Sequence, residues 1–388
     1  MTELLTDKRV AIVGGGPSGL TLARLLQCAG FAPTVFERDA SAKARTQGGS
    51  LDLHPDAAQL ALRAAGLTDA FEAHCRPEDQ NYTIYDQHGT VRASLRAEDA
   101  ADRNPEIDRT TLRDLLIASL APGTIQWGKR LVSAERDDAG KPMLVFDDGS
   151  QETFDLVVGC DGGWSKVRAL VTDLAAPDYT GMTWVQSIIR DARNRYPGVA
   201  DLVHPGSASA NGHGRAIMGQ FDEKGAIRVY IALAVPEGWA QSSSIDFDDV
   251  EAARTALLGY FEGWAPELLD VIKACDGDFM PWPLHSFPPH QEWRPRGDVT
   301  LCGDAAHMMP PYTGRGVNNA MLDSYELARR LTGGDHASIA EAIKSYEDEM
   351  LERMEGAVSA SLGLQDAWFG PDAPEGVARQ VREMAGHA

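Results

Sequence analysis

Short apolar runs recur along the chain, and their pattern indicates buried parallel strands. Four such runs cover residues 9–13, 33–37, 154–161 and 299–304, and three of them lead directly into glycines. Apolar positions at helical spacing follow the first run at Leu20–Ala29. Continuous apolar strands that alternate with amphipathic helices are typical of an α/β fold with a parallel sheet.

The middle of the chain has a different pattern. From Tyr179 to Ala234, polar turns separate alternating strands, which predicts an inserted β-rich domain. On the run Ile227–Val235, the odd-numbered positions are aliphatic and form a core face, whereas the other face carries Arg228 and Tyr230 among alanines. This second face is either a cavity wall or an exposed sheet surface, and the sequence leaves both interpretations open.

Further helices are predicted from the apolar spacing, mainly in the last third of the chain. They cover Ala57–Ala65, Arg109–Leu120, Val250–Glu262, Pro266–Lys273, Val317–Leu331 and Ile339–Leu364, and a last one starts at Glu375. The stretch from Gly370 to Pro374 should end the long C-terminal helix.

A glycine motif stands between the first predicted strand and the first predicted helix. Gly14 allows a tight turn, Gly16 lets a ligand pyrophosphate approach the backbone, and Gly19 lets the helix pack close to the sheet. Glu37 ends the next strand, where it can accept hydrogen bonds from an adenosine ribose. A triphosphate-binding loop would need Lys at the position of Leu20, so the pattern indicates a dinucleotide.

Two later motifs follow predicted strands. The first is Asp161-Gly162-Gly163-Trp164-Ser165-Lys166-Val167-Arg168, and the second is Cys302-Gly303-Asp304-Ala305-Ala306-His307-Met308-Met309-Pro310-Pro311. The second motif continues through Gly314-Arg315-Gly316-Val317-Asn318-Asn319 into a helix.

With these three motifs in this order, the chain resembles the group A flavin-dependent aromatic monooxygenases of the para-hydroxybenzoate hydroxylase fold. The resemblance implies a non-covalently bound FAD, with Asp304 near its ribityl hydroxyls and the helix after Gly316 directed at its pyrimidine ring. Arg38 would lie near the adenosine, and Arg45 and Arg113 would contact the cofactor. The cofactor-binding residues that we expect are Gly14, Gly16, Gly19, Glu37, Arg38, Arg45, Asp52, Arg113, Asp161, Asp304, Pro310, Gly314, Gly316, Val317 and Asn318.

The resemblance also implies a domain organisation: a Rossmann-like FAD-binding domain with an inserted β-rich substrate domain and a C-terminal helix. We expect the FAD-binding domain at residues 1–178 and 285–335, the substrate-binding domain at 179–284, and a C-terminal helical segment at 336–388.

The flavin motifs are most similar to those of the tetracycline-inactivating monooxygenases. Gln186 falls where this subfamily has a substrate-contacting Gln, whereas Arg228 replaces its His and Ser207 falls near its Arg. Two contacts to a tetracycline headgroup would therefore be altered. The substrate-binding residues that we expect are Gln186, Met218, Arg228, Tyr230 and Pro311.

The resemblance implies hydroxylation of an aromatic, phenolic or polycyclic enol substrate, such as a tetracycline-like antibiotic, by NADPH or NADH and O2 through a flavin C4a-hydroperoxide. Because the flavin carries this chemistry, no catalytic side chain is assigned, and His307 is interpreted as packing beside the Gly303-Asp304 loop. Two alternatives stay open: a flavin reductase or dehydrogenase without oxygen insertion, and a non-catalytic flavin-containing protein that binds a ligand.

Composition restricts the partners. The 388 residues carry a formal net charge of −21, which argues against binding to nucleic acid or to an anionic membrane. No apolar run reaches the roughly 20 residues of a membrane span, and no signal peptide or metal-binding cluster is visible. The five cysteines are widely spaced, which is typical of reduced thiols. We therefore expect a cytoplasmic monomer whose basic side chains are concentrated in a cleft near the flavin.

Overall fold

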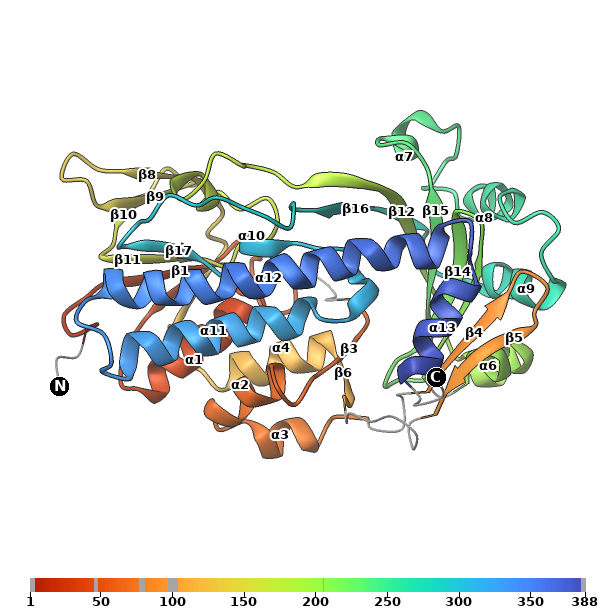
Figure 1. Cartoon of the computed structure of the whole chain (residues 1–388), viewed down its shortest axis with the longest axis horizontal. Coiled ribbons are helices and arrows are strands. Elements are labelled where there is room, and N and C mark those ends of the chain that lie inside the picture. Colours follow the sequence, from red (N-terminus) through yellow and green to blue (C-terminus); the bar gives the residue numbers. More distant parts are fainter. Residues whose placement is uncertain (1–3, 45–47, 77–80, 97–103, 205, 385–388) are drawn as a thin grey trace.

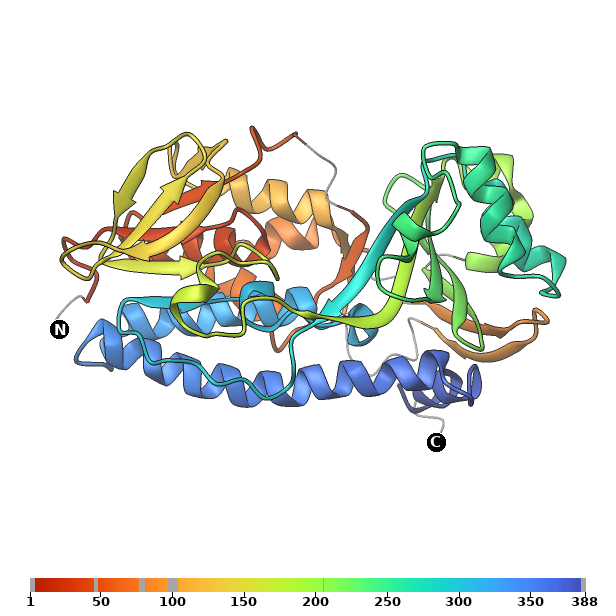
Figure 2. The same ribbon diagram turned by 90° about the horizontal axis from the view of Figure 1, so that it is seen from above.

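The structure is a computed structural model that describes residues 4–44, 48–76, 81–96, 104–204 and 206–384. Figures 1 and 2 show two parts side by side, with the long helix α12 (Ile339–Phe369) running along both of them. The predicted fold class, a Rossmann-like α/β domain with an inserted β-rich part and C-terminal helices, is confirmed.

The first part is built on a parallel sheet of five strands in the order β17-β11-β1-β2-β7. These strands are β1 (Val10–Val13), β2 (Thr34–Glu37), β7 (Ile125–Trp127), β11 (Leu156–Gly159) and β17 (Val299–Leu301). The four apolar runs in the sequence supply four of them. All residues of β1, β11 and β17 are buried, because structure covers both faces of the sheet.

Helices and a small sheet provide that cover. On one side lie α1 (Pro17–Cys28), α2 (Ala58–Ala64), α3 (Thr68–Glu72), α4 (Arg109–Ala118) and α11 (Gly316–Thr332). On the other side lies an antiparallel sheet of β8 (Leu131–Arg136), β9 (Pro142–Phe146) and β10 (Gln151–Thr153). A two-stranded ladder of β3 (Ser50–Asp52) and β6 (Glu106–Asp108) leads towards the second part.

The second part is a seven-stranded sheet in the order β16-β12-β15-β14-β13-β4-β5. Its strands are β4 (Tyr82–Asp86), β5 (Val91–Leu95), β12 (Asp178–Ile189), β13 (Ser207–Gly212), β14 (Arg215–Phe221), β15 (Ile227–Ala234) and β16 (Met280–Ser286). Two strands, β4 and β5, come from the first 178 residues, so this segment contributes to both parts of the molecule. The domain boundaries that we drew from the sequence stay a prediction.

One face of the large sheet is covered by helices. They are α5 (Ala192–Arg195), α6 (Pro197–Val203), α7 (Trp239–Ser242), α8 (Val250–Gly259) and α9 (Pro266–Ala274). Ile227, Val229 and Ile231 of β15 are fully buried in the core with α6, α8 and α9, as the aliphatic face of this strand predicts. The opposite face is directed towards the first part and towards α12 and α13 (Glu375–Met384).

Helix α12 connects the two parts and has well-defined ends. The Ser338 side chain accepts a hydrogen bond from the Glu341 backbone N–H, and the Glu341 carboxylate accepts one from the Ala337 N–H, which resembles a capping box. The helix ends at Phe369, directly before Gly370 and Pro371. None of the helices among the described residues combines the length and apolarity needed to cross a membrane.

Candidate cofactor and substrate site

A cavity of about 810 Å³ lies between the two sheets. Loops after β1, β11 and β17 form one end, and the face of the seven-stranded sheet that carries Tyr230 forms the other end. Its lining includes these expected cofactor residues: Gly14, Gly16, Glu37, Arg38, Asp52, Asp161, Asp304, Pro310, Gly314, Gly316 and Val317. It also includes three expected substrate residues, Met218, Tyr230 and Pro311.

The loop after β1 leaves no room for side chains on two of its glycines. Gly14 has φ +109°, and an added Cβ would lie 2.2 Å from the Cys160 carbonyl oxygen. A Cβ on Gly19 would lie 2.1 Å from the Gly14 carbonyl oxygen, so Gly19 serves helix packing and does not line the cavity. Around Gly16 there is open space, and no side chain caps the N-terminus of α1. The free N–H groups of α1 can therefore bind an anion.

Glu37, at the end of β2, is held by backbone donors. Its carboxylate accepts hydrogen bonds from the N–H groups of Gly15, at 2.6 Å, and Asp39, at 2.8 Å. The side chain is buried and lines the cavity beside Arg38. Each carboxylate oxygen keeps a free lone pair that could accept a ribose hydroxyl.

Arg113 differs from its expected position. It is buried behind the glycine loop, where it donates to the carbonyl oxygens of Gly15, at 3.1 Å, and Ala42, at 2.9 Å, and lies 3.4 Å from Asp39. It does not line the cavity. Arg113 therefore supports the loop, and a direct contact to the cofactor stays a prediction. Arg45 lies outside the described residues.

Asp161 follows β11 and carries a polar atom without a partner. Its Oδ2 accepts the Lys166 backbone N–H at 2.8 Å, whereas its buried Oδ1 has no partner among the described residues. Burial raises the pKa of this carboxyl, and hydrogen bonds from Ser165 and Lys166 oppose the rise. An unpartnered buried oxygen at the wall of a cavity fits a ligand that donates a hydrogen bond.

The loop after β17 is held from behind by a buried carboxylate. Asp323 of α11 accepts the Gly303 backbone N–H at 2.9 Å, His307 Nε2 at 2.6 Å and Arg353 at 2.6 Å. Burial would raise the pKa of Asp323, but His307 and Arg353 hold it below its ordinary value. His307 is itself buried beneath the loop, in agreement with our interpretation, while Asp304 is exposed to the cavity.

Arg168 holds the same loop through its carbonyl groups. Its guanidinium donates to the carbonyl oxygens of Ala305, at 2.9 Å, and Ala306, at 3.0 Å, and lies 3.7 Å from the centre of the Phe287 ring. Burial lowers the pKa of Arg168 to about 10. Arg168, the last residue of the motif that begins at Asp161, thus positions the motif that begins at Cys302.

Asn318 ties α11 to β3 and does not line the cavity. It accepts the His54 backbone N–H at 2.7 Å and donates to the Asp52 carbonyl oxygen at 2.8 Å. Gly314 lies against Asp52, whose carboxylate oxygens would be 3.0 Å from an added Cβ. Asn318 therefore places Asp52 at the cavity, and its own contact to the cofactor stays a prediction.

The substrate face agrees only in part with the expected residues. Tyr230 pairs with Met218 on β14 and with Gln186 on β12. Tyr230 and Met218 line the cavity, whereas Gln186 and Arg228 do not. Gly49 packs against both Tyr230 and Arg228, because an added Cβ would be 2.8 Å from the Tyr230 hydroxyl and 3.1 Å from Cδ of Arg228. The structure thus favours the cavity-wall interpretation for Tyr230 but not for Arg228.

Several lining residues were missed. They are Tyr82, Arg109, Trp164, Trp184, Gln220, Trp282 and His285. Trp184 could have been found, because it is two positions from Gln186 on one strand and therefore shares its face. Tyr82 could not, because no local signal indicates that β4 joins this sheet.

The charge of the lining differs from that of the whole chain. Five basic residues (Arg38, Arg109, Lys129, Arg130 and Lys166) and four acidic ones (Glu37, Asp52, Asp161 and Asp304) line the cavity. In a chain of net charge −21, this is a local enrichment of positive charge. The enrichment is weaker than the concentrated basic cleft that we expected.

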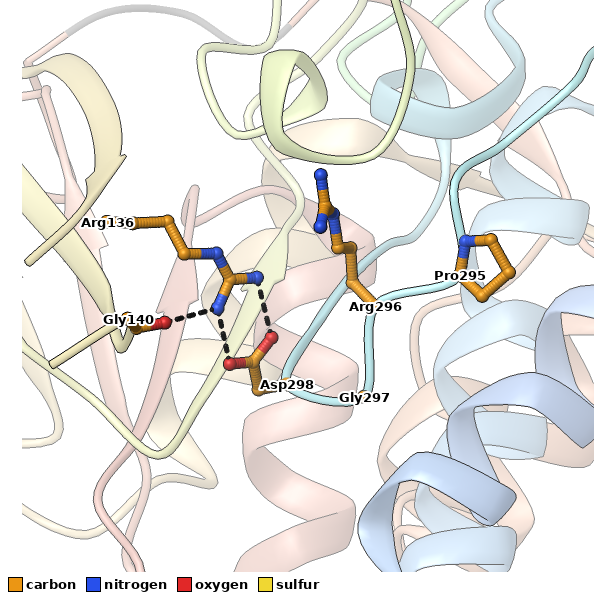
Figure 3. A pocket seen from close by; sticks show the side chains of 6 residues that line it. All are labelled: Arg136, Gly140, Pro295, Arg296, Gly297 and Asp298. Atoms are coloured by element: carbon orange, nitrogen blue, oxygen red, sulfur yellow. Dashed lines mark hydrogen bonds and ion pairs between the residues drawn. The ribbon is translucent and has the colours of Figure 1, made fainter.

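A second hollow lies on the surface of the first part, next to Arg136 and Arg296 (Figure 3). Arg136 binds both carboxylate oxygens of Asp298, at 2.6 and 2.8 Å, and the Gly140 carbonyl oxygen. Arg296 donates to the Leu170 carbonyl oxygen at 2.9 Å. Both guanidinium groups therefore already bind groups of the protein itself. Within the described ranges, no group of three His, Cys, Asp or Glu residues could hold a metal ion.

Comparison with known proteins agrees with a cavity that binds a dinucleotide. A family model described as an FAD binding domain matches residues 7–258 and 271–361. Monooxygenase penA of Penicillium thymicola is 29% identical over 401 residues, with 90% of each chain covered.

Two solved structures share the fold. HpxO of Klebsiella pneumoniae, complexed with FAD and uric acid, has a TM-score of 0.79 at 23% identity and covers 97% of this chain and 93% of its own. The tetracycline destructase Tet(51) has a TM-score of 0.71 at 19% identity and covers 97% and 96%. At these identities the two structures support the fold alone. The match of the family model over most of the chain shows more: this protein belongs to the FAD binding domain family, and its resemblance to the group A flavin-dependent monooxygenases is confirmed.

Proposed function

We propose that the protein is an NAD(P)H-dependent monooxygenase that inserts one oxygen atom into an aromatic, phenolic or polycyclic enol substrate. The observation that carries this proposal is a single cavity that reaches from the glycine loop at Gly14 to an aromatic wall at Trp184 and Tyr230. A cofactor and a planar substrate can meet in such a space. Substrate, O2, NAD(P)H and a proton would give hydroxylated substrate, NAD(P)+ and water.

The residues at the first end of the cavity fit FAD. The uncapped N-terminus of α1 beside Gly16 would bind the pyrophosphate, and Glu37 would accept from the ribose. Asp304 would accept from a ribityl hydroxyl. Helix α11 begins at Gly316 without a side-chain cap, so its positive end would favour electron density on the flavin pyrimidine ring. When bound, FAD supplies hydride acceptance and O2 activation.

The side chains at the other end orient the substrate and exclude water. Met218, Leu284 and Trp184 give an apolar wall, and Tyr230 gives it a polar edge. Burial raises the pKa of Tyr230, partly offset by the charges of Arg228 and Arg109, so its hydroxyl keeps its proton at neutral pH. Pro311 lies between the two ends and would hold the backbone close to the flavin.

The nicotinamide cofactor would enter the same cavity only transiently, because the sequence has one dinucleotide fingerprint. Trp164 is 54% exposed and lines the cavity with Lys166, so these two residues are available to a visiting dinucleotide. All five cysteines are free thiols, which supports a reducing, cytoplasmic location.

The test is a turnover screen of the FAD-reconstituted protein. NADPH and NADH oxidation and O2 uptake are measured with salicylate, hydroxynaphthoate, uric acid and anhydrotetracycline, and products are analysed by mass spectrometry under isotopically labelled O2. We expect at least one compound to stimulate oxidation and to gain one labelled oxygen atom.

Two other results would replace this function. Stimulated oxidation that yields only hydrogen peroxide would indicate a reductase or dehydrogenase. Ligand binding without any oxidation of NADPH or NADH would indicate a flavin-containing binding protein.

A further inference from the structure

Two cysteines stand side by side at the cofactor end of the cavity. Cys160 directly follows β11, and Cys302 directly follows β17. These strands are parallel neighbours in which Gly159 pairs with Leu301, so the two cysteines are next in the same register. The Cys302 N–H donates to the Gly159 carbonyl oxygen at 2.9 Å, which continues the ladder as far as the cysteines. Neighbouring strands lie about 4.8 Å apart, and a disulfide joins Cα atoms about 4.4 to 6.8 Å apart.

The two side chains also contact each other. In-register neighbours on paired strands point to the same face of a sheet. The Ser18 hydroxyl of α1 donates to the Cys160 sulfur at 3.6 Å, and the Tyr346 hydroxyl of α12 lies 3.3 Å from the Cys302 sulfur. Burial raises the pKa of the Cys302 thiol well above its ordinary value, and a hydrogen bond with Cys160 raises it further. The two sulfur atoms are therefore direct neighbours.

Both cysteines line the cavity, so a small molecule that enters it can reach them. Cys160 is half-buried, whereas Cys302 is 1% exposed, so an oxidant meets Cys160 first. Cys275 differs, because it is buried in the core behind the seven-stranded sheet, where its thiol donates to the Val271 carbonyl oxygen. A reachable thiol with a second thiol beside it is the arrangement that converts oxidation of one cysteine into a disulfide.

We propose that Cys160 and Cys302 form a disulfide when a peroxide enters the FAD-free cavity, and that this disulfide lowers the affinity for FAD. The Cys160 sulfur, after losing its proton, attacks hydrogen peroxide, which gives a sulfenic acid and one molecule of water. The Cys302 sulfur then attacks this sulfenic acid, so that the S–S bond forms and a second molecule of water leaves. In total, two thiols lose two protons and two electrons, and the O–O bond of the peroxide is reduced to two molecules of water.

The disulfide would act on FAD through the loops that follow the two strands. Cys160 contacts the glycine loop, because an added Cβ on Gly14 would lie 2.2 Å from the Cys160 carbonyl oxygen. Cys302 directly precedes Gly303 and Asp304, which line the other side of the cofactor site. Strands about 4.8 Å apart hold opposite Cβ atoms wider than the roughly 3.8 Å of a disulfide, so closing the bond moves both loops. Bound FAD in turn covers the pair. The disulfide depends on the cofactor site and not on the reaction proposed above.

The test treats the full-length protein with hydrogen peroxide at limiting and at saturating FAD. At limiting FAD, peptide mass spectrometry without reduction should show a crosslink between Cys160 and Cys302. FAD at about ten times its dissociation constant should slow crosslinking about tenfold, because only the FAD-free fraction reacts. Fluorescence titration of the oxidised protein should give an FAD affinity about tenfold weaker, and dithiothreitol should restore the original affinity.

Matched variants separate this pair from the other thiols. Cys302→Ser keeps the size of the side chain but removes the second sulfur, so no crosslink should form and dimedone should label Cys160 as a sulfenic acid. Cys275→Ser makes the same change outside the cavity, and it should crosslink and lose FAD affinity as the wild type does. If Cys302→Ser does not fold, the crosslink map of the wild type decides the pairing by itself.

Two results would overturn the proposal. If both cysteines of the peroxide-treated wild type remained thiols, or were oxidised separately without a crosslink, the pair would not be a disulfide site. A crosslink that left FAD affinity unchanged would remove the effect on the cofactor. Neither result bears on the monooxygenase reaction, which the turnover screen tests separately.

Discussion

The two ends of the cavity are built differently. At the cofactor end, buried charged side chains hold the loops through backbone groups: Arg113 holds Gly15, Arg168 holds Ala305 and Ala306, and Asp323 holds Gly303. At the substrate end, the wall consists mainly of packed aromatic rings: Trp184 contacts Tyr230 and Tyr312. The first end is thus held by hydrogen bonds to its loops, whereas the second end is held by ring packing. Perturbing each end should therefore affect different steps.

The largest effect is expected at the glycine loop. Gly14→Ala would place a Cβ 2.2 Å from the Cys160 carbonyl oxygen at a φ of +109°, so the loop must move. We expect FAD affinity to fall by on the order of a hundredfold or more, measured by flavin fluorescence titration.

Gly30→Ala is the matched control for this change. Gly30 also has positive φ, +89°, but an added Cβ would meet no atom within 4 Å. It should lose about 1 kcal/mol of stability and keep its FAD affinity. Equal FAD affinity in the two variants would show that the loop is not rigid.

A smaller effect is expected from the support behind the loop. Asp323→Asn keeps the shape of the side chain but removes the negative charge beside His307 and Arg353. Removing one partner of a buried ion pair costs roughly 3 kcal/mol. We expect this loss in denaturant unfolding of the apoprotein, together with weaker FAD binding.

Asp348→Asn on α12 is the control, since Asp348 pairs with Lys344 at the exposed surface. It should cost less than about 1 kcal/mol and leave FAD binding unchanged. If Asp323→Asn lost stability but bound FAD normally, Asp323 would support the fold and not the cofactor loop.

The smallest effect is expected at Glu347, a buried carboxyl whose charged form is disfavoured by burial. Burial raises the pKa of Glu347 to about 7, and its hydrogen bond from Thr300 of β17 only partly offsets this. The folded state therefore binds this proton more tightly than the unfolded state, and stability falls as the pH rises through that value. Glu347→Gln should be more stable than the wild type by roughly 2 kcal/mol at about pH 8 and equal to it near about pH 4.

Thermal unfolding across this pH range measures the difference, and the exposed Glu352→Gln on α12 is its control. FAD affinity should not change in either variant. A stabilisation that is independent of pH would contradict the assigned titration.

The cofactor end was largely predictable from sequence, and the substrate end was not. Gly14, Gly16, Glu37, Asp161 and Asp304 line the cavity as expected, because each follows a strand whose carboxyl end must lie at the same edge of the sheet. Arg113 was placed correctly on its helix, but a guanidinium reaches several ångströms, and only the packing shows that it turns to the loop. Asn318 was also placed correctly on its helix, and only the packing shows that its side chain turns to β3.

At the other end, strand alternation assigned the correct face of β15 but could not say which part of that face is covered. Arg228 shares its face with Tyr230 and both side chains lie against Gly49 from the first part of the molecule, yet only Tyr230 lines the cavity. Tyr82 reaches the same wall because β4 pairs with β13, a strand that comes much later in the sequence.

Sequence alone is sufficient for the fold class, for the glycine turns and for the strand ends that surround a dinucleotide, because these depend on local backbone geometry and on periodicity. The wall that faces the substrate depends on the register between β4, β12, β13, β14 and β15, and on the loop that packs against them. Contacts between distant segments leave no local pattern, so only the tertiary structure brings Trp184, Tyr230 and Arg109 to one cavity.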